Sequence, residues 1–108
     1  MGFGNLAKMA QQMQADMARV EEELRGLQLE GTAGGGAVTA VVTGKQELVS
    51  ISIDPGVVDP EDVEMLQDLV TAAVNDGLRR ARETAEEKLG RVTGGLRIPG
   101  MGLSLIHI

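Results

Sequence analysis

The chain has 108 residues, a formal net charge of −6 and a hydrophobic content of 43%. This length accommodates one domain, and this hydrophobic content excludes an intrinsically disordered chain. The absence of cysteine excludes disulfides and thiolate metal sites, and the single aromatic residue, Phe3, leaves a core of aliphatic side chains and methionines. A small chain with so little bulk for its core is expected to gain stability from a second copy.

Neither catalysis nor membrane insertion is indicated. The only histidine is His107, beside the C-terminus, so we expect no Ser-His-Asp set. The run GTAGGG at 31–36 lacks the Lys-Ser/Thr of a phosphate-binding loop, and we interpret it as a flexible turn. No apolar run approaches the roughly 20 residues of a membrane span, and no secretory signal is visible. We therefore expect a cytoplasmic protein that is not an enzyme and uses no cofactor, metal or small-molecule substrate.

Residues 5–30 begin the chain with an apolar stripe at alternating spacings of three and four, which predicts a helix that packs against another helix. Asn5 is the candidate N-cap, because its side chain can accept from the first free backbone N–H groups. The stripe can serve the core of its own domain, a dimer seam, or both. Its predicted seam residues are Leu6, Met9, Met13, Met17, Val20 and Leu24.

The middle of the chain alternates in the manner of β-strands. AVTAVVTG at 37–44 and LVSISID at 48–54 read as a hairpin whose turn contains Gly44, and part of 27–34 is a candidate third strand. The alternation predicts an antiparallel sheet with one buried face. That face is expected to carry Val38, Ala40, Val42, Val49, Ile51 and Ile53.

A long second helix is predicted from the start of the 60s to about residue 92. Asp59 followed by Pro60 reads as its N-cap and first helical residue, and a short break is considered near 65–69. The TGG at 93–95 ends the helix. We expect residues 1–96 to form a single α+β domain and residues 97–108 to form a flexible tail.

Charge is polarised along the chain. Residues 54–76 hold seven acids and no base, whereas residues 77–108 hold six bases and three acids, with LRRARE at 78–83 as the densest basic run. Three pairs of opposite charge lie four residues apart and can stabilise a solvated helix face without any further role: Arg79–Glu83, Arg82–Glu86 and Glu87–Arg91. Three bases remain uncommitted and available to phosphates: Arg80, Lys88 and Arg97.

Several stretches, in their order and spacing, resemble the YbaB/EbfC family of bacterial nucleoid-associated proteins. They are GNLAKMAQQMQADM at 4–17, ISIDP at 51–55, DPEDVEMLQDLV at 59–70, AAVNDGLRRARE at 72–83, and the TGG and PGM that follow. The resemblance covers residues 4–102. It implies an N-terminal helix, a small three-stranded antiparallel sheet, a short helix that leads into a long C-terminal helix, and a tweezer-like homodimer.

The resemblance also implies electrostatic binding of double-stranded DNA, with little sequence preference, by helical arms of a protein located in the nucleoid. Family binding is attributed to the first and last helices, which on this chain carry Lys8, Arg19, Arg79, Arg80, Arg82, Lys88 and Arg91. The alternative is a helical protein-interaction module without intrinsic DNA binding. In that case the methionine stripe would serve a protein partner, and the basic run would be a solvated face.

Overall fold

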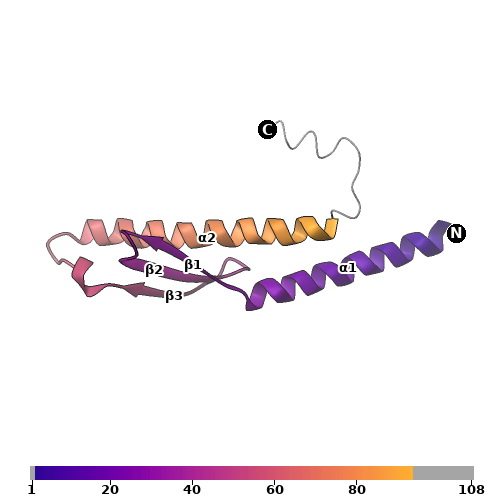
Figure 1. Ribbon diagram of the computed structural model, residues 1–108, viewed down its shortest axis with the longest axis horizontal. Coiled ribbons are helices and arrows are strands. Elements are labelled where there is room, and N and C mark those ends of the chain that lie inside the picture. Colours follow the sequence, from indigo (N-terminus) through magenta and orange to yellow (C-terminus); the bar gives the residue numbers. More distant parts are fainter. Residues whose placement is uncertain (1, 94–108) are drawn as a thin grey trace, which may run out of the picture.

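The computed structural model describes residues 2–93, which form two long helices and one sheet (Figure 1). In chain order the elements are α1 (Gly2–Gly26), β1 (Gln28–Ala33), β2 (Val38–Thr43), β3 (Leu48–Ile53), the 3-10 turn η1 (Pro55–Val57) and α2 (Val63–Thr93). The predicted α+β class, with an antiparallel sheet between an N-terminal and a long C-terminal helix, is confirmed. The expected tail at 97–108 lies outside the described residues, and the domain extent of 1–96 stays a prediction.

The three strands form an antiparallel sheet in the order β1-β2-β3. Val38, at the start of β2, pairs with Ala33 of β1 on one side and with Ile53 of β3 on the other. The candidate strand within 27–34 is therefore β1, which forms one edge of the sheet while β3 forms the other. Neither helix of the described part carries an apolar stretch long enough to cross a membrane.

The core lies between the sheet and α2, which runs over β1 and β2 (Figure 1). Val38, Ala40 and Val42 of β2 are fully buried, so the alternation correctly predicted the inner face of this strand. From α2, Ala73 and Ala81 are fully buried as well. Because these helix side chains are so small, α2 can lie close to the strands.

The prediction of an inner face was wrong for β3, all six of whose residues are exposed. Ile51 and Ile53 stand opposite Ala40 and Val38, so they face the same side of the sheet as the core. They are nevertheless 38% and 37% exposed, and Val49 is 51% exposed. The reason is that α2 lies over β1 and β2, which leaves the far edge of the sheet uncovered by the helix.

The helix α2 contacts β1 through backbone atoms. A Cβ atom on Gly31 of β1 would lie 2.1 Å from the nitrogen of Gly77 and 2.2 Å from the oxygen of Ala73. A Cβ on Gly77 would lie 3.3 Å from Cγ1 of Val42. Ala73, Gly77 and Ala81 thus form a stripe of small residues at four-residue spacing, on the one side of α2 that meets the sheet.

The turns between the strands use positive φ angles. Gly34, Gly35 and Gly36 connect β1 to β2 with φ of 64°, 67° and 94°. The second half of the GTAGGG run is therefore the predicted turn, whereas its first half, residues 31–33, belongs to β1. In the β2–β3 turn the positive φ of 63° belongs to Gln46, not to Gly44. Gly44 is required for a different reason, because its Cβ would lie 2.6 Å from the backbone oxygen of Leu24.

The predicted start of the second helix was three residues early. Asp62 is the residue that caps α2, since its Oδ1 accepts a hydrogen bond from the N–H of Met65 at 3.2 Å. The Asp59 carboxylate closes a turn before the helix by accepting from the N–H of Glu61 at 2.9 Å. The helix then continues without the break considered near 65–69.

Candidate nucleic-acid interface

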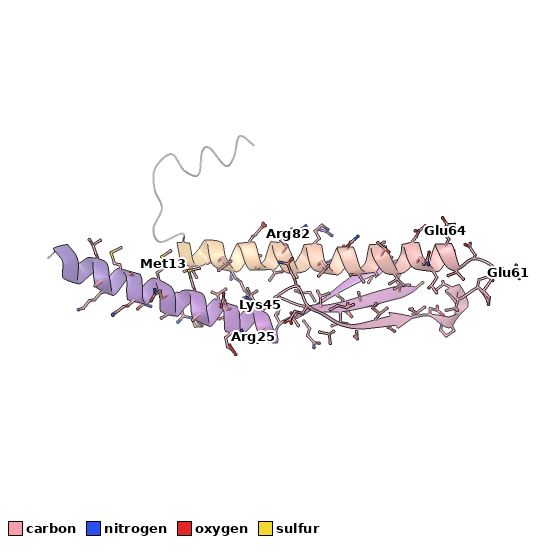
Figure 2. The ribbon with its side chains drawn as sticks, turned by 180° about the vertical axis from the view of Figure 1, so that it is seen from behind. Met13, Arg25, Lys45, Glu61, Glu64 and Arg82 are labelled. Carbon is pink, nitrogen blue, oxygen red and sulfur yellow. The ribbon has the colours of Figure 1, made fainter. Side chains whose placement is uncertain are left out.

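The candidate interface is formed by the two helices, which run antiparallel to each other (Figure 1). α1 already begins at Gly2, so Asn5, the predicted cap, lies inside the helix. At the other end of α1, the N–H of Gly44 donates to the oxygen of Leu27 at 3.0 Å and holds the chain against the β2–β3 turn. From this base, the first half of α1 extends past the end of α2 at Thr93 (Figures 1 and 2).

The six predicted seam residues of α1 differ in how far they are buried. Val20 and Leu24, near the base, are only 7% and 3% exposed, in the half of the helix that packs against α2 and the sheet. Met13 is half-buried. The other three are exposed, at 62% for Leu6, 51% for Met9 and 40% for Met17. The stripe therefore supplies intramolecular packing at Val20 and Leu24 and leaves Leu6, Met9 and Met17 exposed.

A cleft of about 290 Å³ lies between α1 and α2 where the two helices begin to separate. It brings together three of the seven predicted DNA contacts, Arg19 from α1 with Lys88 and Arg91 from α2. Two acids, Asp16 and Glu23, line the same cleft. Cations that are about 70 residues apart in sequence thus converge on one cleft, where they outnumber the two acids that line it.

Each cation of this cleft has a carboxylate partner. Arg19 pairs with Asp16 on its own helix. The Nζ of Lys88 lies 3.3 Å from the Oε2 of Glu23, which joins α2 to α1. Arg91 pairs with Glu87, one turn earlier on α2, at 2.7 Å. Each of the three cations that line the cleft is therefore paired with a carboxylate of the described chain.

Asp76 of α2 organises the basic run further along the helix. Its Oδ2 accepts from the backbone N–H of Thr32 in β1 at 3.0 Å, and its Oδ1 accepts from Nη2 of Arg79 at 2.7 Å. Nε of Arg80 lies 3.3 Å from Oδ2. On its other side, Nη1 of Arg79 donates to Oε1 of Glu83 at 2.6 Å. One carboxylate therefore ties the helix to the edge strand and orients two of the predicted DNA contacts.

These contacts shift two pKa values. The pKa of Asp76 lies below its usual range, chiefly because the N–H of Thr32 donates to the charged form and next because Arg79 does. The pKa of Arg79 is raised, first by its hydrogen bond to Asp76 and then by the charge of Glu83. Sequence analysis missed Asp76. Its spacing of three and four residues from Arg79 and Arg80 was a usable signal, whereas its bond to Thr32 exists only in the folded chain.

The pairing of the basic residues differs from the sequence-based expectation in three places. The pairs Arg79–Glu83 and Glu87–Arg91 are confirmed. Arg80 and Lys88 were expected to be uncommitted and are not, because Asp76 lies one turn before Arg80 and folding brings Glu23 beside Lys88.

The third difference concerns Arg82, which was expected to pair with Glu86. Among the described residues neither of these two side chains forms an ion pair or a side-chain hydrogen bond, and the same holds for Lys8 on the exposed half of α1. Arg82 lies exposed on α2 (Figure 2). Arg82 and Lys8 are thus the two predicted DNA contacts without a carboxylate partner in the described chain. Arg97, which was also expected to be uncommitted, lies outside the described residues.

The lowered pKa of Asp76 predicts a pH-dependent contribution to stability. A carboxylate whose pKa is depressed by folding stabilises the fold above its unfolded pKa, and this stabilisation is lost as the pH falls through the folded value. We expect Asp76→Asn to be less stable than the wild type at pH 7, and we expect this difference to shrink as the pH falls below about 4. Asp68→Asn, on the exposed face of the same helix, is the control and should show little difference at either pH. Denaturant melts at pH 7 and pH 3 make the comparison, and a pH-independent loss in Asp76→Asn would show that shape, not charge, matters there.

Fold and site together define a small α+β protein with two antiparallel helices that carry paired and unpaired cations. Comparison with known proteins identifies the class. A model of the YbaB/EbfC DNA-binding family matches residues 1–96. The chain therefore belongs to the YbaB/EbfC family, as the ordered stretches of its sequence indicated.

Individual relatives agree with this assignment. The chain is 55% identical over 105 residues to a nucleoid-associated protein of Acetivibrio thermocellus, with 93% of both chains covered. It is 55% identical over 92 residues to a nucleoid-associated protein of Chloroflexus aurantiacus, which covers 85% of this chain and 92% of the relative. The crystal structure of the uncharacterized protein HP0035 from Helicobacter pylori superposes with a TM-score of 0.70 at 29% identity, over 81% of this chain and 91% of that one.

Proposed function

We propose that this protein is a nucleoid-associated protein that binds double-stranded DNA as a homodimer, mainly through charge and with little sequence preference. The observation that carries the proposal is the convergence of Arg19, Lys88 and Arg91 from two helices on one cleft, in a chain that belongs to a DNA-binding family. Lys8 on α1 and Arg82 on α2 are exposed cations outside this cleft that add to the positive charge of the two helices. Such contacts bind the phosphate backbone by releasing its counterions and read no bases, so the affinity falls as salt rises.

The distribution of acids supports docking by the helical arms. Glu61 and Glu64 lie at the opposite end of the molecule from Met13, near the start of α2 (Figure 2). Residues 54–76 carry seven acids and no base. A duplex is repelled from that end and attracted to the end where α1 and α2 separate, which orients the encounter. Because only one aromatic residue is present, single-strand binding by base stacking is disfavoured.

The uncovered face of β3 supports the homodimer. Leu48, Val49, Ile51 and Ile53 are between 37% and 51% exposed, and Val58 beyond the strand is 51% exposed. An edge strand with a row of apolar side chains invites pairing with another chain, and contiguous patches of this kind mark interaction sites. We place the contact with the second copy on this face. Contact of the exposed seam residues of α1, Leu6, Met9 and Met17, with the partner stays a prediction.

A pair of substitutions on β3 tests this placement. Ile51→Asp puts a charge on the proposed dimer face, whereas Ser52→Asp puts the same charge on the opposite face of the same strand. Light scattering should give a mass near twice 11.4 kDa for the wild type and for Ser52→Asp, and a monomer mass for Ile51→Asp. A monomeric wild type at micromolar concentration would rule out the dimer. An Ile51→Asp variant that stays dimeric would move the contact to another surface.

The DNA-binding proposal is tested by gel shift with several unrelated duplexes at low and moderate salt. We expect binding of all of them within a few-fold of one another and a steep loss of affinity between about 50 and 200 mM salt. No binding at low salt would contradict the proposal. The protein-interaction alternative would then gain weight, since the exposed methionines of α1 and the paired cations of α2 are also what such a module would present.

A further inference from the structure

Five of the seven predicted DNA contacts are engaged by carboxylates of the same chain. The internal pairs are Arg19–Asp16, Arg79 with both Asp76 and Glu83, Arg80–Asp76, Lys88–Glu23 and Arg91–Glu87. A carboxylate presents its oxygens to a guanidinium much as a phosphate does. Each of these acids therefore occupies the donors that a DNA phosphate would need.

Arg79 shows the arrangement most clearly. Its two terminal nitrogens are both committed, Nη1 to Glu83 at 2.6 Å and Nη2 to Asp76 at 2.7 Å. The side chains of Arg79 and Glu83 are 51% and 53% exposed, so solvent and a ligand reach this pair. Asp76, at 20%, is more enclosed and is also bound to the backbone of β1. Glu83 is thus the partner that a phosphate can displace without disturbing the fold.

We infer that these carboxylates compete with DNA phosphates for the same cations and so hold the affinity for duplex below what the basic residues alone would give. The inference rests on the proposed function, whose site it describes more closely. A phosphate that reaches Arg79 takes the place of Glu83, and the displaced carboxylate then repels the backbone. Contacts at Arg82 and Lys8 need no such exchange. The basic run therefore contains one immediate contact and two that are masked, although its three arginines lie within four positions.

The chain offers a matched control in Glu86, which is exposed, lies three residues after Glu83 on α2 and forms no ion pair among the described residues. Glu83→Gln and Glu86→Gln remove the same charge from the same helix, and glutamine keeps the helix propensity. Only Glu83→Gln frees a cation, Arg79, from an ion pair. A change in net charge alone predicts the same gain of affinity from both.

The experiment measures binding of one fixed duplex by fluorescence anisotropy, at one salt concentration, for both glutamate variants in the wild-type and in the Arg79→Gln background. We expect Glu83→Gln to tighten binding about two- to fivefold more than Glu86→Gln, the ratio that corresponds to an exposed ion pair. In the Arg79→Gln background this extra gain should vanish, since the carboxylate acts through Arg79. Thermal melts of all variants should agree with their parents within a few degrees.

Three results would overturn the inference. Equal gains from Glu83→Gln and Glu86→Gln, or a gain that persists in the Arg79→Gln background, would mean that only net charge counts. Weaker binding by Glu83→Gln would mean that the carboxylate positions Arg79 for DNA and does not mask it. All three leave the proposed function standing, because the wild type still binds. A wild type that binds no duplex overturns the proposed function and this inference together.

Discussion

Gly31→Ala is expected to destabilise the protein by about 3 kcal/mol or more, at the upper end of what overpacking in a core costs. The added methyl group would lie 2.1 Å from the nitrogen of Gly77 and 2.2 Å from the oxygen of Ala73. Both are backbone atoms, so a change of rotamer relieves neither clash. Either α2 moves off the sheet or β1 bends away from the helix. Each movement opens the buried packing around Ala73, in a domain whose total stability is about 5–15 kcal/mol.

The control is Gly90→Ala, where a Cβ meets no atom of the rest of the described chain within 4 Å, its own helix backbone aside. Replacing glycine in a helix interior should stabilise the protein by up to about 1 kcal/mol, so the two variants are expected to differ in sign. Denaturant melts at one fixed protein concentration measure both, since the proposed homodimer makes stability depend on concentration. Gly31→Ala with the stability of the wild type would mean that α2 and β1 do not approach as closely as the structure places them.

The second large effect is expected in DNA affinity. Replacing Arg79, Arg80 and Arg82 together by glutamine should weaken binding to all duplexes, broadly independently of sequence, because bonds to phosphates carry no sequence information. The slope of log K against log salt should flatten by about 0.9 for each phosphate that the variant no longer neutralises. The cost in folding stability should stay small, since the ion pairs of Arg79 and Arg80 are open to solvent and exposed pairs contribute little to stability.

The single variants should not be equal. Arg82→Gln is expected to weaken binding the most, because Arg82 gives up no internal partner when it meets a phosphate. Arg25→Gln removes the same charge from the base of α1, where Arg25 pairs with Glu22 away from the cleft, and it should change affinity little. Suppose the triple variant melts like the wild type and binds with the same affinity and salt slope. The basic run would then be a solvated helix face, and the protein-interaction alternative would take over.

The sequence alone determined the order and type of the elements, because those features depend on local periodicity. Alternation in β2 identified Val38, Ala40 and Val42 as the buried side of the strand, and the ordered stretches from residue 4 onward identified the family. Pairs one turn apart on a helix, such as Arg79 with Glu83, were also predictable, since the helix itself sets their distance. The N-cap of α2 was less predictable, because Asp59 and Asp62 both precede a helical pattern. Only their hydrogen bonds show that Asp62 caps the helix.

Tertiary structure decided which of these faces and charges are available. The alternation of β3 is as regular as that of β2, yet its apolar side is exposed because a single helix lies over β1 and β2. The close approach of Gly31 to Gly77 fixes that position of α2. The same packing brings Glu23 onto Lys88 and Asp76 onto Thr32, pairs of residues that lie 65 and 44 positions apart in the chain. No local pattern encodes such distances, so the sequence showed where the cations are and the fold determined which of them are already occupied.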